Sequence, residues 1–146
     1  MKQLLFVVLV LFALPCPAEH QYEIYYQSET EETIQLTVKV YGVKEKQADY
    51  YACLDVVQAL IFEGIQGSKR RYLPYVHDQQ DSYHDHEAYY RNLFDKGGFL
   101  SLVVASSVKE KGKSNKKKYY LVDVNINFKA LKESLVRHNV MRRFGV

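Results

Sequence analysis

Residues 33–43 read TIQLTVKVYGV, and this stretch decides which kind of fold the chain can adopt. Apolar side chains occupy every second position, and most of the positions between them are polar. Strict alternation predicts a β-strand with one face on a core and the other face in water. The residues expected on the core face are Ile34, Leu36, Val38 and Val40.

The same period returns near the end of the chain, where residues 119–128 read YYLVDVNINF. Residues 99–108 are rich in β-forming side chains, and the lysine-rich segment 109–118 predicts the tip of a hairpin between the two runs. A shorter strand is expected at residues 22–26. The inward-facing residues predicted for the late hairpin are Leu100, Leu102, Val104, Val108, Tyr120, Val122, Val124, Ile126 and Phe128.

A segment whose apolar residues follow the spacing of a helix lies between the predicted strands. Residues 47–63 place Ala48, Ala52, Val56, Ala59 and Leu60 on one stripe, and Gly64 follows where a C-terminal cap belongs.

Two further helices follow a long loop at residues 65–81. One is expected to begin at Ser82, whose hydroxyl could cap the amide of Asp85. The other spans about residues 129–138, buries Leu131 and Leu135, and is closed by Asn139. We therefore expect an α+β fold, with a mainly antiparallel sheet of three to five strands and two or three helices packed on one face.

The composition fits one globular domain, because 47% of the residues are hydrophobic and 25% are charged. The first 18 residues are different. Lys2 precedes an apolar run from Leu4 to Leu14, and small residues stand one and three positions before a cut after Ala18. This pattern predicts a signal peptide at 1–18 and a single exported α+β domain at 19–146, secreted or periplasmic, with no transmembrane segment in the mature chain. Lipoprotein processing at Cys16 is the alternative. When Cys16 is removed with the signal peptide, Cys53 is the remaining cysteine, expected as a small core residue.

The strand ending Val38-x-Val40-x-Gly42, followed by the helix with Ala48, Ala52, Ala59 and Gly64, resembles small α+β modules of bacterial envelope proteins. Examples are the N-terminal domain of flagellar T-ring proteins and related short envelope lipoproteins. The resemblance covers residues 33–64 and then only the order of elements. It implies a non-catalytic assembly or accessory role and assigns no functional residue.

Histidines and acids are densest at residues 77–87, which read HDQQDSYHDHE. Imidazole and carboxylate groups are ligands of zinc and similar divalent metals. The spacing of two between His84 and His86 does not place both on one helical face. A divalent metal site, and with it a metal-dependent hydrolase, is therefore only the alternative hypothesis for this chain. Its candidate ligands are His77, Asp81, His84 and His86.

Charge is divided unequally along the chain. Residues 19–108 hold 8 basic and 14 acidic side chains, whereas residues 109–146 hold 11 basic and 3 acidic ones. We found no phosphate-binding glycine loop, no nucleophile-elbow motif and no paired-cysteine metal motif. The first hypothesis is therefore a non-enzymatic interaction module without a cofactor. Its partner is expected to be another envelope protein or an anionic envelope component, and not nucleic acid. The predicted contact residues are Lys109, Lys111, Lys113, Lys116, Lys117, Lys118 and Tyr119.

Overall fold

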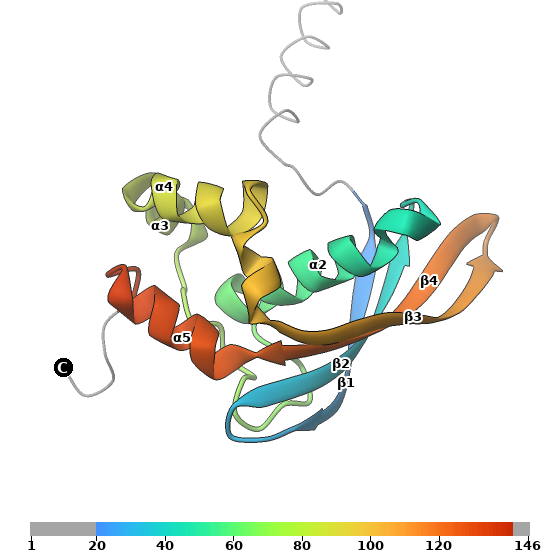
Figure 1. The fold of residues 1–146 in the computed structure, drawn as a ribbon, viewed down its shortest axis with the longest axis horizontal. Helices are drawn as coiled ribbons and strands as arrows, with labels where there is room; N and C mark the ends of the chain where they lie inside the picture. Colours follow the sequence, from blue (N-terminus) through green and yellow to red (C-terminus); the bar gives the residue numbers. More distant parts are fainter. Residues whose placement is uncertain (1–19, 142–146) are drawn as a thin grey trace, which may run out of the picture.

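The structure, a computed structural model, describes residues 20–141, so the predicted signal peptide and its cleavage site lie outside the described residues. It is an α+β fold built on one four-stranded antiparallel sheet (Figure 1). The strands are β1 (Tyr22–Glu29), β2 (Thr33–Tyr41), β3 (Val103–Ser114) and β4 (Lys117–Asn127). The helices are α2 (Ala48–Phe62), α3 (Gln79–Asp85), α4 (Glu87–Tyr90) and α5 (Phe128–Arg137), with the 3-10 turns η1 (Glu45–Gln47) and η3 (Gly98–Leu102) and the π-helical turn η2 (Arg91–Asp95).

The sheet runs in the order β1-β2-β4-β3, so the first hairpin and the last hairpin meet at β2 and β4. Their register pairs Ile34 with Ile126 and Val38 with Val122, which puts the two alternating apolar sets on the same face. All four predicted core residues of β2 are fully buried. The five inward residues predicted for 119–128 are buried as well, which confirms both strands.

Helix α2 crosses this apolar face (Figure 1). Ala48, Ala52 and Ala59 are at most 1% exposed, and side chains this small let the helix axis lie close to the sheet. Gly64 adopts a positive φ of 84° after the helix, as predicted for its cap. A Cβ at that position would overlap the backbone of Tyr72, so glycine is required there for space as well as for conformation.

The remaining helices gather around the C-terminal end of α2. Phe62 stacks on Tyr83 of α3 with ring centroids 5.6 Å apart, and Tyr83 stacks on Tyr90 of α4 at 4.4 Å. Leu131 and Leu135 of α5 are fully buried, and Asn139 takes the predicted left-handed conformation. The sequence therefore predicted the helices expected at 47–63 and 129–138 and the presence of each strand, although not the bounds of the third.

Residues 99–102 correct the predicted start of the third strand. Gly97, at a φ of 75°, turns the chain into η3, where Phe99 and Leu102 reach the core at a spacing of three. β3 pairs with β4 alone and is interrupted by two irregularities of register. Its predicted core residues Val104 and Val108 are therefore 57% and 38% exposed, because an edge strand with bulges loses its alternation.

The second helical region also begins earlier than predicted. The side chain of Asp78, not that of Ser82, caps α3 by accepting the amide hydrogen of Asp81. Ser82 lies inside the helix, and its hydroxyl bonds instead to the hydroxyl of Tyr90 at 2.5 Å. The chain then breaks at His86 before α4 begins.

Candidate functional site

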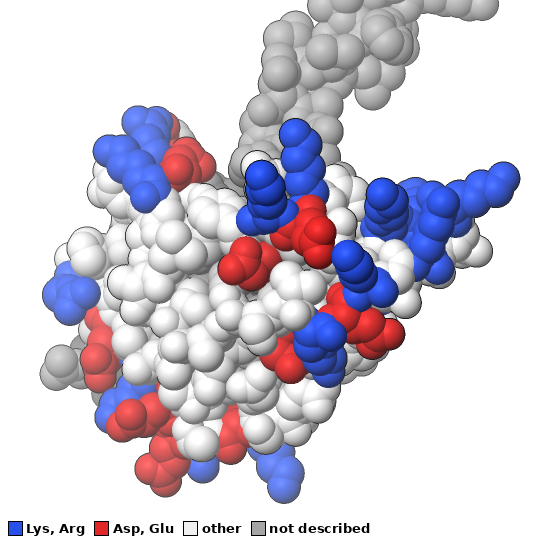
Figure 2. Space-filling model, turned by 45° about the vertical axis from the view of Figure 1, so that its right-hand side comes forward, with Lys and Arg blue, Asp and Glu red and all other residues white. Residues whose placement is uncertain are grey.

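The lysine-rich segment is a regular two-stranded ribbon rather than a long tip. β3 continues to Ser114 and β4 starts at Lys117, so the turn itself consists of Asn115 and Lys116. Both turn residues have positive φ, 50° and 68°, the pattern of a type I′ turn, which suits the right-handed twist of two paired strands. The ribbon carries its exposed lysines away from the body of the protein, and Figure 2 shows basic side chains gathered at this projecting end.

Three of the six lysines are engaged by neighbouring elements. Lys109 lies 3.4 Å from Asp123 of β4, Lys111 lies 3.5 Å from Glu45 of η1, and Lys117 donates to the side-chain oxygen of Gln21 at 3.3 Å. Lys113, Lys116 and Lys118 have no ion-pair partner within residues 20–141. The ribbon therefore presents positive charge that the described part of the chain does not neutralise.

Tyr119, the seventh predicted contact residue, is half-buried on the sheet face opposite α2. Its ring lies 6.0 Å from that of Tyr41, and the Lys39 ammonium sits 4.4 Å from its centroid. Its hydroxyl lies against Gly112, where a Cβ would overlap it. Tyr119 is therefore packed within the sheet face and is less available to a partner than the lysines.

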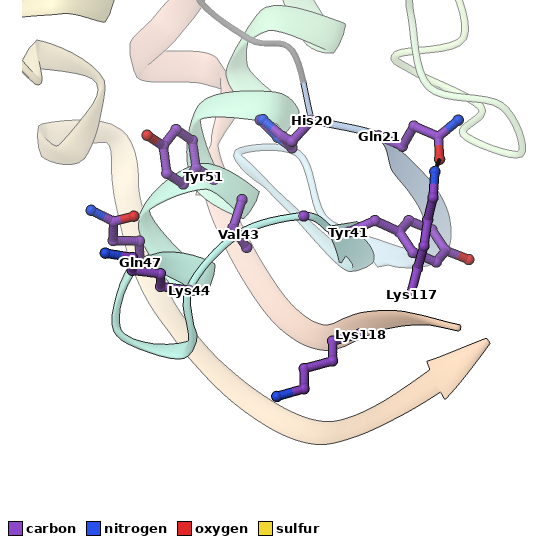
Figure 3. A pocket seen from close by; sticks show the side chains of 10 residues that line it. His20, Gln21, Tyr41, Val43, Lys44, Gln47, Tyr51, Lys117 and Lys118 are labelled. Carbon is purple, nitrogen blue, oxygen red and sulfur yellow. Dashed lines mark hydrogen bonds between the residues drawn. The ribbon is translucent and has the colours of Figure 1, made fainter. Parts of the chain in front are cut away.

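A hollow of about 700 Å³ lies where the turn end of the lysine ribbon, at Lys117 and Lys118, meets the loop after β2 and the start of α2 (Figure 3). We call it the basic hollow. Three lysines line it and no aspartate or glutamate does. Its lining consists of His20, Gln21, Tyr41, Gly42, Val43, Lys44, Gln47, Tyr51, Lys117 and Lys118.

Segments that are distant in the sequence meet in this hollow. Figure 3 shows Tyr41 and Lys117 on one side of it, Lys44 and Gln47 on the other, and Lys118 below. The turn at Gly42, with a φ of 72°, directs the loop away from β2 toward α2. The backbone N–H groups of Gly42, Val43 and Lys44 have no hydrogen-bond partner among the described residues, so this loop can supply donors to a ligand.

Next to the hollow is a buried ionisable pair that sequence reasoning missed. Nε2 of His20 lies 2.7 Å from Oδ2 of Asp55, and the two side chains are 6% and 0% exposed. Burial raises the pKa of Asp55 to about 7, although the contact with His20 opposes that rise. The other carboxylate oxygen is buried without a partner among the described residues. The pair ties the start of the described chain to α2.

The signal for this pair was present in the sequence. Asp55 falls between Leu54 and Val56 in the most apolar helix, and a charged residue in that position needs a partner. What the sequence did not provide was the partner, which lies 35 residues earlier.

The predicted metal ligands are not brought together. Within residues 20–141 no group of three or more His, Cys, Asp or Glu side chains is arranged to hold a metal ion. His77 precedes α3, Asp81 and His84 lie within α3, and His86 lies at the break before α4. The metal-site hypothesis therefore has no geometric support in the described residues.

Cys53 is a core residue, as predicted, and is 1% exposed. Burial raises the pKa of its thiol to about 11, so the thiol is protonated near neutral pH. A buried, protonated thiol is a poor nucleophile.

Comparison with known proteins adds no assignment. No protein-family model, no curated protein and no solved structure matches this chain. Functional inference therefore depends on the geometry described above.

A second cleft, of about 680 Å³, separates α4 and η2 from α5. Its lining contains both signs of charge, with Asp85, Glu87 and Glu133 beside the basic Arg137 in the same set. The basic hollow differs because all its formally charged side chains are lysines.

Proposed function

We propose that this protein is an exported, non-enzymatic interaction module of the bacterial cell envelope that binds an anionic partner through its lysine ribbon. The observation that supports this proposal is the projecting β3–β4 ribbon, whose lysines exceed the acids around them (Figure 2). A positive surface of this kind attracts anions over roughly one Debye length, about 8 Å at physiological salt.

The other parts of the proposal have separate support. The N-terminal sequence pattern supports export, and no helix within residues 20–141 is long and apolar enough to cross a membrane. The inert Cys53 thiol and the dispersed histidines support a binding role over a catalytic one. The resemblance of residues 33–64 to envelope modules suggests the compartment.

The test is retention of the purified chain on anionic envelope components, with vesicles of phosphatidylglycerol and phosphatidylcholine as the defined probe. Replacing Lys116, Lys117 and Lys118 together by Gln should reduce retention at least about tenfold, since each exposed basic residue near an anionic surface contributes about 1 kcal/mol. Raising the salt concentration should weaken the wild-type interaction in the same way.

The matched control removes the same charge elsewhere. Replacing Lys69, Lys96 and Lys129 by Gln should leave retention within about twofold of the wild type, because these lysines lie outside the ribbon. Equal retention of the wild-type and ribbon variants would reject the proposed function. Equal loss in the ribbon and control variants would show that net charge alone is responsible.

A further inference from the structure

We propose that the basic hollow is a binding site for a phosphate monoester. This inference rests on the proposed function, because it names the anionic group that the lysine-bearing end of the molecule recognises. It goes beyond that function by placing recognition in a defined hollow rather than over the whole ribbon.

The first argument is the origin of the cations. Lys117 and Lys118 belong to β4, and Lys44 belongs to the loop before α2. The fold brings them to one hollow that contains no carboxylate, so nothing in its lining competes for them as a counter-ion. Lys109 and Lys111, which lie farther from the turn, each have an acidic neighbour instead.

The second argument is the supply of neutral hydrogen-bond donors. Besides the lysines, the lining contains the uncharged polar residues Gln21, Tyr41, Gln47 and Tyr51. The backbone N–H groups of the loop at residues 42–44, which have no partner within residues 20–141, add donors. Successive amides in a loop with one positive-φ residue are a common feature of anion sites.

Charge and size together favour a phosphate monoester over a carboxylate. A phosphate monoester carries a charge of about −1.5 to −2 at neutral pH and has three strong acceptor oxygens, which matches several cations and many donors. The hollow of about 700 Å³ is larger than phosphate alone and lies within the usual range of about 300–1,000 Å³ for small-molecule sites. It therefore has room for a sugar or glycerol body beside the phosphate.

His20 fixes one wall of the hollow. Its Nε2 atom is held by Asp55, and its ring lies 5.0 Å from the ring of Tyr51. These contacts hold two lining side chains in place before any ligand arrives, which reduces the entropy lost on binding.

The experiment is calorimetric titration of the purified chain with glycerol 3-phosphate, with inorganic phosphate and glycerol as comparison ligands. Glycerol 3-phosphate and phosphate should bind, and glycerol should not. Lys117→Gln with Lys118→Gln should weaken binding about tenfold or more, because hydrogen bonds to charged groups are lost.

Two matched controls separate the hollow from the rest of the basic surface. Lys113→Gln with Lys116→Gln removes the same charge from the same ribbon outside the lining, and should change affinity less than about threefold. Lys44→Gln should weaken binding, whereas Lys46→Gln, two residues away and outside the lining, should not. Circular dichroism confirms that each variant is folded, and all six lysines are surface residues.

Vesicles distinguish the source of the phosphate. One result is that the chain binds phosphatidylcholine vesicles that contain phosphatidic acid more tightly than free glycerol 3-phosphate. If the Lys117 and Lys118 variant loses this binding, the phosphate recognised is that of a lipid headgroup. Tighter binding to free glycerol 3-phosphate than to the vesicles indicates a soluble phosphate ester. Either order supports the site.

Three outcomes would overturn it. If the variant at Lys117 and Lys118 and the variant at Lys113 and Lys116 lose the same affinity for glycerol 3-phosphate, the hollow is rejected as the site. The proposed function is unaffected by that result. Failure of wild-type protein to bind any phosphate probe, with ribbon-dependent retention on phosphatidylglycerol vesicles preserved, would do the same. Absence of both activities would reject the inference and the proposed function together.

Discussion

Asp55 is the one carboxylate that is fully buried among the described residues. Its pKa is raised from 3.8 to about 7 by burial, so the folded chain keeps a proton that the unfolded chain releases. Between about pH 4 and pH 7 the folded state therefore binds more protons at this group, and the free energy of unfolding should fall as the pH rises. Over this pH range, the proton held by Asp55 lowers the free energy of unfolding by about 4 kcal/mol in total as the pH rises.

Asp55→Asn should remove most of this pH dependence. Urea unfolding at several pH values between 4 and 8 measures it directly. Asp49→Asn, in the first turn of the same helix, is the matched control and should keep the wild-type slope. An unchanged slope in Asp55→Asn would show that the carboxylate does not hold this proton in the folded state.

At the scale of elements, the β3–β4 ribbon carries its own local strain. Lys116 has a φ of 68°, a left-handed conformation that costs a non-glycine residue about 1–2 kcal/mol. Asn115 tolerates that region better, and Asn-Gly is the preferred pair for this kind of two-residue turn. The position of Lys116 is therefore stabilised by neither conformation nor an ion pair with residues 20–141.

Lys116→Gly should stabilise the protein by about 0.5–1 kcal/mol, the conformational gain less the added freedom of the unfolded chain. Lys113→Gly, in the regular part of β3, should destabilise it by a similar amount. If the turn geometry is correct, denaturant unfolding should show a higher free energy of unfolding for Lys116→Gly and a lower one for Lys113→Gly, each relative to the wild type. A loss of stability in both would contradict it.

At the scale of the whole molecule, the separated charge in the sequence takes a definite form. The β3–β4 ribbon projects from one end of the sheet (Figure 1) and carries the late basic residues, and its turn end forms the basic hollow with the loop before α2 (Figure 3). The start of the described chain is tied to the same region through His20 and Asp55.

Export predicts a defined N-terminus for the mature protein. Mass spectrometry of the chain recovered from the cell envelope or medium should find Glu19 first, because Cys16 and Ala18 are small residues at the positions that precede the cut. Ala18→Arg should block this cut and leave a longer chain. A lipid-modified Cys16 at the N-terminus would instead establish the lipoprotein alternative.

Much of the fold was predictable because its elements have strong local periodicity. The alternation in residues 33–43 and 119–128 and the alanine stripe of α2 all lead to buried faces, as expected. Prediction failed at residues 99–102, where a β-forming run became η3 because Gly97 turns the chain and Phe99 fits the core. It also failed at Ser82, since either Asp78 or Ser82 has the chemistry of a cap and packing against Tyr90 selected between them.

The site was predictable only in part. Six lysines in ten residues were evident from the sequence, and they do form an exposed basic ribbon. The sequence could not indicate that two of them would share a hollow with Lys44, or that His20 would bind Asp55. Those contacts join residues that are 35 to more than 70 positions apart, and no short-range pattern encodes such distances.

The sequence by itself determined the faces of β2 and β4, the packing stripe of α2 and the sign of the charge at each end of the chain. These follow from side-chain period and composition, which are local properties. Only the tertiary structure decided which strand became the edge, which buried acid found a partner and where the lysines converge. Those outcomes depend on the order of strands in the sheet and on the path of the loop at residues 42–44, because both are set by the packing of the whole core.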